Sequence, residues 1–202
     1  MIRAGTPAIT PADIVVTRQG ARFLGRTFPC SIGRGGVTLA KREGDGATPA
    51  GIHRITGMLY RPDRLSAETL PGWAVPIGPG DLWSDDVADP AYNRLVRAPH
   101  RFSHERLRRA DPLYDLVLIT DWNWPRAIPG KGSAIFVHSW RKPRHPTAGC
   151  VAFARQDLLW IAPRIRRGTR LIVRPDLFPN RFGGPILPET GGFHGQDTEN
   201  RR

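Results

Sequence analysis

The sequence predicts a mainly β protein with a few short helices, built as a single domain of the β-sandwich or β-barrel kind. Glycine and proline are the first observation: there are 22 and 20 of them, about a fifth of the 202 residues, and such a content favours turns and short strands. The second is a series of short β-branched and aromatic runs bounded by glycine or proline. The third is the length, because a chain of this size can bury a core in one domain without disulfides.

The strand pattern recurs from one end of the chain to the other. "LYDLVLIT" and "SAIFVH" are near-continuous apolar runs, which is typical of strands buried on both faces. By contrast, "KREGDGATPAG" (41–51) is expected to be a loop, since Asp45-Gly46 is turn chemistry and Thr48-Pro49 forces an extended approach to the next strand. The expected strands are 13–17, 21–33, 52–60, 113–120, 133–138 and 169–174.

Two segments are expected to be helical. "SHERLRRA" (103–110) can begin a short helix with Ser103 as its N-cap and Glu105 in its first turn. "RQDLLWIAPRI" places its leucines and isoleucine on one helical face and is expected to end near Gly168. Residues 61–100 are rich in proline and are expected to form an irregular excursion, either over the surface or as a wall of a cleft.

The two ends of the chain differ from the domain between them. Residues 1–12 are expected to be a loose lead-in to a domain at 13–174, and the Pro, Gly and polar tail at 175–202 has no periodicity and is expected to be flexible. The first residues lack the apolar core of a signal peptide, and no apolar run reaches membrane-spanning length. As written, the sequence therefore predicts a cytoplasmic protein with no membrane span.

The formal net charge of +12 comes almost entirely from arginine and favours anionic partners such as nucleic acid, a membrane surface or a carboxylate-rich polymer. No run of five basic residues occurs, and no aromatic residues are interleaved for base stacking, so no nucleic acid is expected. The glycine-rich "IGRGGV" and "EGDGAT" lack the following helix that a phosphate site needs. His100 and His104 cannot share a helix that begins at Ser103. We expect no metal, no cofactor and a monomer.

One stretch, "HPTAGCVAF", suggests chemistry because Cys150 follows directly on a glycine. His138 ends an apolar strand twelve residues earlier, and the intervening loop and the turn at Gly149 could bring thiol and imidazole within hydrogen-bond reach. An imidazole so placed would lower the thiol pKa and carry protons, and N–H groups of the turn at Ala148 and Gly149 could face an oxyanion. The residues alone also allow two separate packing roles. Cys30 is expected to be buried in a strand, and no disulfide is expected.

Three segments resemble one family in the right order. "GSAIFVHSW" followed by "PTAGCVAF" is similar to the active-site signature of the L,D-transpeptidase catalytic domain, the YkuD family. "KREGDGATPAGIHRI" resembles the family's Thr-Pro-x-Gly segment, and "DLLWIAPRIRRGTRLIV" resembles its closing helix and final strand. The resemblance spans roughly residues 14–174.

The resemblance implies a mostly β domain that acts on peptidoglycan stem peptides in the cell envelope or periplasm. Cys150 matches the nucleophile, His138 the general acid/base and Gly149 the glycine of the turn. The thiolate would attack the carbonyl of the position-three diamino acid, D-alanine would leave, and an amine acceptor would resolve the thioester. The resemblance also implies that a carbapenem acylates Cys150. Nearby candidates for holding substrate are Arg141, Arg144 and Thr147, with Arg155 further along the chain.

Two departures from the family pattern leave the acceptor open. Ala148 stands where many members have histidine, and Ala152 stands where they have arginine or asparagine. Water instead of an amine would make the protein an L,D-carboxypeptidase, which could act on recycled cytosolic fragments. The sequence also leaves open a sortase-like enzyme, which usually has a longer His-to-Cys interval, and a non-enzymatic basic binding module.

Overall fold

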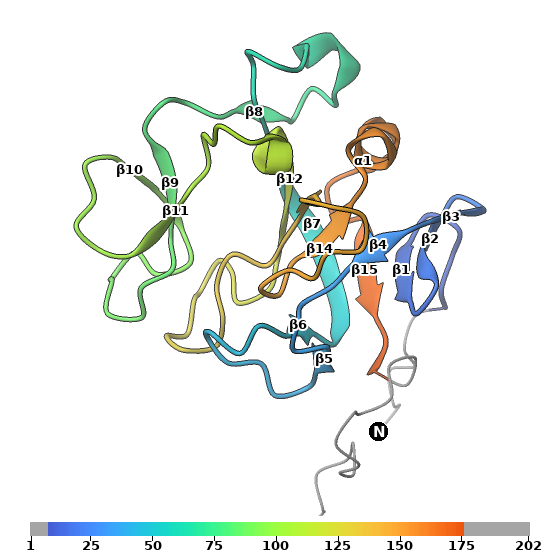
Figure 1. Cartoon of the computed structure of the whole chain (residues 1–202), viewed down its shortest axis with the longest axis horizontal. Helices are drawn as coiled ribbons and strands as arrows, with labels where there is room; N and C mark the ends of the chain where they lie inside the picture. The colour runs from blue at the N-terminus through green and yellow to red at the C-terminus, as the bar shows by residue number, and fades with distance from the viewer. Residues whose placement is uncertain (1–7, 176–202) are drawn as a thin grey trace, which may run out of the picture.

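The computed structural model describes residues 8–175, and most of its strands belong to one mixed sheet (Figure 1). The strand order is β3-β2-β1-β15-β7-β12-β13-β14-β4, with β8 paired to β7. The pairs β1–β15, β13–β14 and β7–β8 are parallel, and the other pairs are antiparallel. The strands of this sheet are β1 (Ile14–Thr17), β2 (Gly20–Phe23), β3 (Arg26–Phe28), β4 (Cys30–Ser31), β7 (Gly51–Tyr60), β8 (Val75–Pro76), β12 (Leu116–Thr120), β13 (Phe136–Ser139), β14 (Val151–Phe153) and β15 (Arg170–Val173).

The sheet curls into a nearly closed barrel because its two end strands are neighbours in the chain. β3 ends at Phe28 and β4 begins at Cys30, so a single residue, Pro29, separates the two edges of the strand order. The long strand β7 is shared between the two halves, since it pairs with β15 on one side and β12 on the other. The predicted β-rich, barrel-like single domain is therefore confirmed.

The interior of this barrel is apolar, with buried side chains from nearly every strand, among them Ile14, Phe23, Met58, Val137 and Phe153. The one α-helix of the described residues, α1 (Arg155–Ile161), buries Leu158 and Ile161 in the same core. The described part of the chain also has three short 3₁₀ helices, at Ala67–Thr69, Pro112–Tyr114 and Ala162–Arg164. No helix among the described residues is long and apolar enough to cross a membrane.

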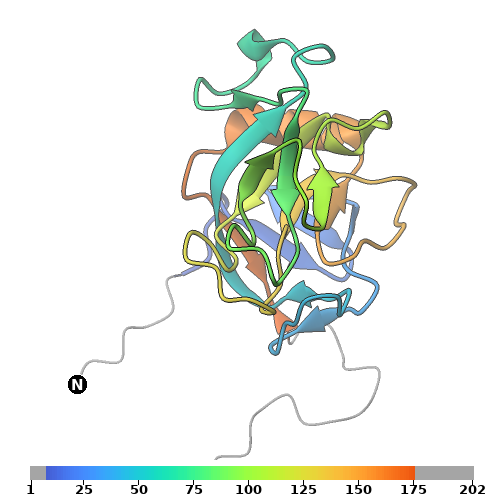
Figure 2. The same ribbon diagram turned by 90° about the vertical axis from the view of Figure 1, so that its left-hand side faces the viewer.

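A second, smaller sheet lies beside the barrel, and Figure 2 shows it facing the viewer. Its order is β10-β9-β11, with β9 at Asp81–Ser84, β10 at Leu95–Arg97 and β11 at His104–Arg106. Trp83 and Leu107 from this part of the chain pack with Phe136, Tyr114 and Cys150 into a second buried cluster. The proline-rich segment is thus more ordered than expected, because it supplies two strands of this sheet.

The prediction of a helix over 103–110 is wrong. His104–Arg106 instead pairs with β9, with Glu105 opposite Trp83. The burial of neighbouring side chains alternates here, as in a strand: Leu107 is fully buried, whereas Arg106 is exposed. Pairing with a neighbouring strand has overridden the local helix signals.

The remaining strands, β5 (Val37–Thr38) and β6 (Thr48–Pro49), form a two-stranded parallel sheet around the loop 41–47. Both cysteines are free; Cys30 lies in strand β4 and packs against the barrel core, but it is half-buried where a buried residue was expected. The expected lead-in at 1–12 lies outside the described residues up to residue 7, and the tail at 175–202 lies outside them from residue 176.

Candidate active site

Strands β13 and β14 bring His138 and Cys150 to one face of the sheet. They run parallel, with His138 aligned to Ala152 and Val137 to Val151. Cys150 stands two residues before Ala152, so its side chain leaves the sheet on the same side as the imidazole. Both side chains line one cavity of about 310 Å³, so the predicted pair shares a single site.

The thiol of Cys150 is buried and held by backbone groups. Its Sγ donates to the carbonyl oxygen of Ala134 at 3.1 Å and accepts the N–H of Phe136 at 3.4 Å. Burial raises the pKa of the thiol to about 12 because the apolar surroundings disfavour the anion. Desolvation dominates this pKa, whereas the sequence predicted a lowering by the imidazole, and the direction of the shift favours the protonated thiol.

His138 is held by its own backbone neighbour. Nδ1 lies 2.8 Å from the carbonyl oxygen of Ser139, and because a carbonyl only accepts, Nδ1 carries the proton and Nε2 is the basic nitrogen. The ring of Tyr114 meets the imidazole edge to face, with 5.2 Å between centroids. Burial lowers the pKa of His138 to about 4, so the imidazole is neutral at physiological pH. Among the described residues, no hydrogen bond joins it directly to the thiol.

The turn before Cys150 requires a glycine at position 149, because of both its backbone conformation and the space around it. Gly149 has φ of +147°, and a Cβ there would lie 3.0 Å from the carbonyl oxygen of Ala47 and 3.2 Å from Ile135. The Thr147 hydroxyl accepts the Gly149 N–H at 3.1 Å and donates to the Cys150 carbonyl. Ala148 and Thr147 both line the cavity, yet the Thr147 hydroxyl, considered for substrate binding, is engaged within the turn.

Three arginines line the cavity, and sequence proximity identified only one of them. Arg141 is there as expected, whereas Arg144 does not belong to the described lining and Arg155 is paired with Asp115 at 3.1 Å. The other two are Arg34 and Arg109. Arg34 arrives through a bridge between Gly33 and Thr147, a contact between distant segments that leaves no local sequence signal.

Glu105 is the sole acid among the described cavity residues. It accepts a hydrogen bond from the Tyr114 hydroxyl, and burial raises its pKa. Arg109 stacks on the Tyr114 ring, 5.3 Å from its centroid, and pairs with Asp111. The sequence analysis did not identify Glu105, Arg109 and Tyr114, because these residues come from the small sheet and the turn after it.

His145 and Trp140 also line the cavity, although the sequence pattern did not indicate either as a site residue.

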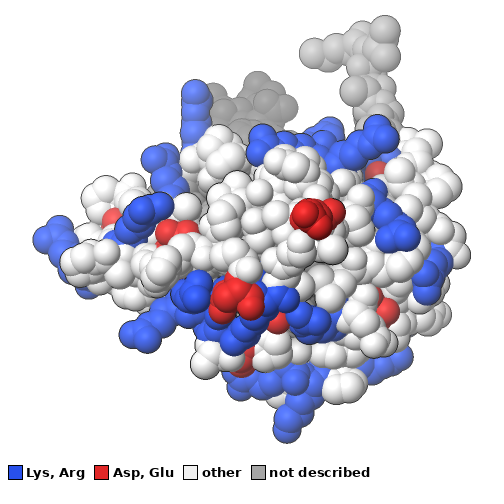
Figure 3. Space-filling view, turned by 90° about the horizontal axis from the view of Figure 1, so that it is seen from above, with Lys and Arg blue, Asp and Glu red and all other residues white. Residues whose placement is uncertain are grey.

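The described residues contain no cluster of three or more His, Cys, Asp or Glu side chains suited to a metal ion. On the face seen in Figure 3, basic side chains are scattered with acidic ones between them and do not form one continuous patch. The side chains that line the cavity supply a neutral imidazole, a protonated thiol and arginine guanidinium groups.

Comparison with known families gives one match that covers most of the chain. The family model described as the L,D-transpeptidase catalytic domain, YkuD, matches residues 11–173. No curated protein and no solved structure gave a significant match.

Proposed function

Since the chain belongs to the family of L,D-transpeptidase catalytic domains, we propose that it is a cysteine acyltransferase that uses Cys150 as nucleophile and His138 as general acid/base. Membership implies a peptidoglycan enzyme of the L,D-transpeptidase type. The proposed donor is a stem tetrapeptide, cleaved between the position-three diamino acid and D-alanine. The proposed acceptor is the amine of a second stem peptide.

The observation that carries this proposal is a shared cavity: it holds the neutral imidazole of His138 on β13 and the neutral thiol of Cys150, directly before the parallel strand β14. In such a pair the proton moves during attack, because neither group is ionised beforehand. Nε2 of His138 takes the thiol proton while Sγ bonds to the donor carbonyl carbon. The imidazolium then protonates the amine of D-alanine as the C–N bond breaks, which leaves a thioester on Cys150. An acceptor amine attacks this thioester, and His138 takes a proton from that amine. As the C–S bond breaks, the imidazolium gives this proton to the sulfur, which restores the thiol and the neutral imidazole.

The cavity charge supports a carboxylate-bearing donor. Arg34, Arg109 and Arg141 surround the reacting pair, and guanidinium groups bind carboxylates through paired hydrogen bonds. A stem tetrapeptide carries the carboxylate of its terminal D-alanine close to the bond that is cleaved. Arg109 is already paired with Asp111, so we propose that Arg34 and Arg141 hold that end of the donor.

Hydrolysis is the second candidate, and one observation favours it. Ala152 occupies a position where many members have a polar side chain, and here it is fully buried. It therefore offers nothing for binding an acceptor amine. Water could take the amine's place, which would make the protein an L,D-carboxypeptidase.

The test is turnover of a purified tetrapeptide stem with and without an acceptor peptide. Release of D-alanine together with a cross-linked product supports transfer, and release at the same rate with no such product supports hydrolysis. Cys150→Ala should abolish both, whereas Cys30→Ser should retain the activity, because Cys30 does not line the described cavity.

Intact mass after incubation with a carbapenem gives an independent readout. An adduct on the wild type and on Cys30→Ser, but not on Cys150→Ala, is expected. A folded wild type with neither adduct nor D-alanine release would leave a non-enzymatic binding role.

A further inference from the structure

Thr48, which is far from Cys150 in sequence, forms a hydrogen bond to the turn that carries Cys150. The Thr48 hydroxyl lies 2.8 Å from the carbonyl oxygen of Gly149 and 2.9 Å from the backbone nitrogen of Gly33. Thr48 is 1% exposed, so neither bond competes with solvent. Because the Gly33 N–H must donate to the hydroxyl, the hydroxyl's own proton is directed to the Gly149 carbonyl.

Two threonines thereby hold three of the four backbone polar groups of Gly149 and Cys150. Thr147 holds the Gly149 N–H and the Cys150 carbonyl, and Thr48 holds the Gly149 carbonyl. The fourth group is the Cys150 N–H. It shares a planar trans peptide with the Gly149 carbonyl, so the two point in opposite directions. A hydrogen bond that fixes the oxygen therefore also fixes the direction of this N–H.

The lining of the cavity agrees with that orientation. Ala148 and Cys150 line it, whereas Gly149, whose carbonyl is turned to Thr48, does not belong to the described lining. From this geometry we propose that Thr48 is a positioning residue that aims the Cys150 N–H at the oxyanion of the acylation step. The inference rests on the proposed function, since it concerns the thioester-forming reaction of the same site.

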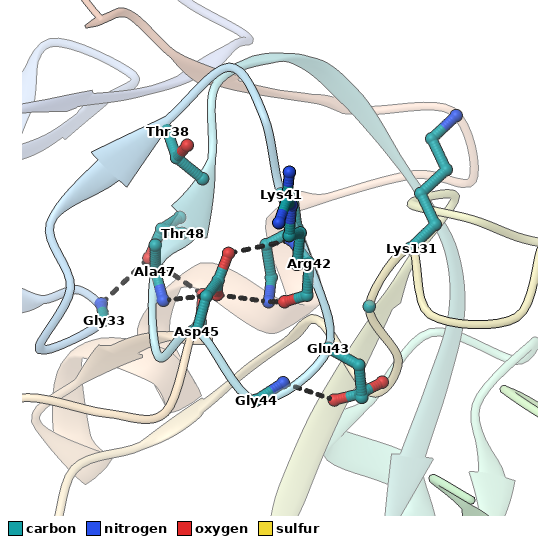
Figure 4. A network of polar contacts seen from close by, with 12 residues as sticks. Gly33, Thr38, Lys41, Arg42, Glu43, Gly44, Asp45, Ala47, Thr48 and Lys131 are labelled. Carbon is teal, nitrogen blue, oxygen red and sulfur yellow. Dashed lines mark hydrogen bonds and ion pairs between the residues drawn. The ribbon is translucent and has the colours of Figure 1, made fainter. Parts of the chain in front are cut away.

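The loop that presents Thr48 is held by polar contacts among its own residues, as Figure 4 shows. Asp45 accepts Lys41 Nζ at 2.7 Å and the Ala47 N–H at 2.8 Å through one oxygen, and the Arg42 N–H at 2.8 Å through the other. The Lys41 side chain is only 2% exposed. Pro49 favours the extended backbone of Thr48 just after this loop. The hydroxyl thus stands ready before substrate arrives, as preorganised stabilisation of charge requires.

The test compares variants that keep or remove the hydroxyl. Thr48→Val preserves the shape of the side chain and removes the donor, whereas Thr48→Ser keeps it. Thr38→Val is the matched control, because the Thr38 hydroxyl accepts the Ala40 N–H at 3.1 Å and, among the described residues, has no hydrogen bond to the turn at Gly149. Two rates are measured in each: acylation of Cys150 by the tetrapeptide in a single turnover, and alkylation of Cys150 by iodoacetamide at pH 10, which forms no oxyanion.

Thr48→Val should slow acylation by about 10- to 100-fold, the range expected when an oxyanion donor is misdirected. Its alkylation rate should change less than about threefold, and the loss should appear in kcat more than in KM. Thr48→Ser and Thr38→Val should acylate within about threefold of the wild type. Acylation by Thr48→Val at the wild-type rate, or equal losses in both rates, would overturn the proposal.

If Thr48→Val does not fold, Thr48→Ala and Thr48→Ser provide the same comparison, because they differ by one oxygen atom. The alanine variant should then show the selective loss of acylation, and equal acylation in the two would overturn the inference. The wild type separates this proposal from the wider one: without acylation of wild-type Cys150 the proposed function itself fails, whatever the variants do.

Discussion

The thiol of Cys150 is directed at the carbonyl oxygen of Ala134, with 3.1 Å between Sγ and the oxygen. Ala134 is itself fixed in a left-handed conformation, with φ of +50°, and its N–H donates to the Asn93 side chain at 3.0 Å. The nucleophile proposed here therefore rests as a thiol bonded to backbone, and not as a thiolate paired with an imidazolium. This resting state has consequences for its pH dependence.

Alkylation of Cys150 should be slow at neutral pH. Only the thiolate reacts with iodoacetamide, and burial raises the thiol pKa to about 12, so the rate should rise about tenfold for each pH unit up to that value. The measurement is intact mass against time between pH 7 and 11, in a Cys30→Ser background that leaves one thiol. A rate that levels off near pH 7 or below would show a thiolate–imidazolium pair instead.

Acylation, in contrast, should persist well below pH 6. His138 must be neutral to accept the thiol proton, and burial lowers its pKa from 6.5 to about 4. The value of kcat/KM for the tetrapeptide should therefore stay level down to about pH 5 and fall by half near pH 4. Circular dichroism at each pH checks that the protein remains folded. This control is needed because the unfolded chain binds a proton at His138 more readily than the folded one, so stability falls as the pH falls from 6.5 to about 4. A midpoint at 6.5 or higher would contradict the assignment.

The strands could be predicted from the local sequence pattern, but most of the residues that line the cavity could not. The runs at 113–120 and 133–138 are apolar enough to indicate buried strands; β12 lies within the first, and β13 overlaps the second and ends one residue beyond it. The local pattern favours a helix at Glu105 because a short polar segment with Ser103 ahead of it satisfies capping rules. Its true partner, Trp83 on β9, lies more than twenty residues away, beyond the reach of any local rule.

The same limit applies to charge and ionisation. Arg34 reaches the cavity through the bridge between Gly33 and Thr147, more than one hundred residues apart. The Ser139 carbonyl that orients His138 is a backbone group and has no residue signature. The thiol pKa depends on how many apolar atoms surround Cys150 in three dimensions, which the Ala-Gly-Cys motif does not encode.

Arg141 and Arg144 offer a matched pair for testing substrate binding, because they are three residues apart in one loop and only Arg141 lines the cavity. Arg141→Ala should raise KM for the tetrapeptide by about 5- to 20-fold, as expected for loss of a charge-assisted hydrogen bond to a carboxylate. Arg144→Ala should leave KM within about twofold. Equal effects of the two variants, measured at several salt concentrations, would indicate a general charge effect instead of a specific contact.

Gly149→Ala should damage both stability and activity, and Gly36→Ala separates the causes. Both glycines have positive φ, +147° and +77°, but a Cβ at Gly36 has nothing within 4 Å, whereas one at Gly149 would press on Ala47 and Ile135. Backbone strain alone should lower the free energy of unfolding of Gly36→Ala by about 1–2 kcal/mol. Strain and overpacking together should lower that of Gly149→Ala by about 2–4 kcal/mol. Denaturant unfolding measures both values. Acylation should fall at least tenfold only in Gly149→Ala, because that substitution displaces the peptide that carries the Cys150 N–H, and normal acylation in a folded Gly149→Ala would refute this.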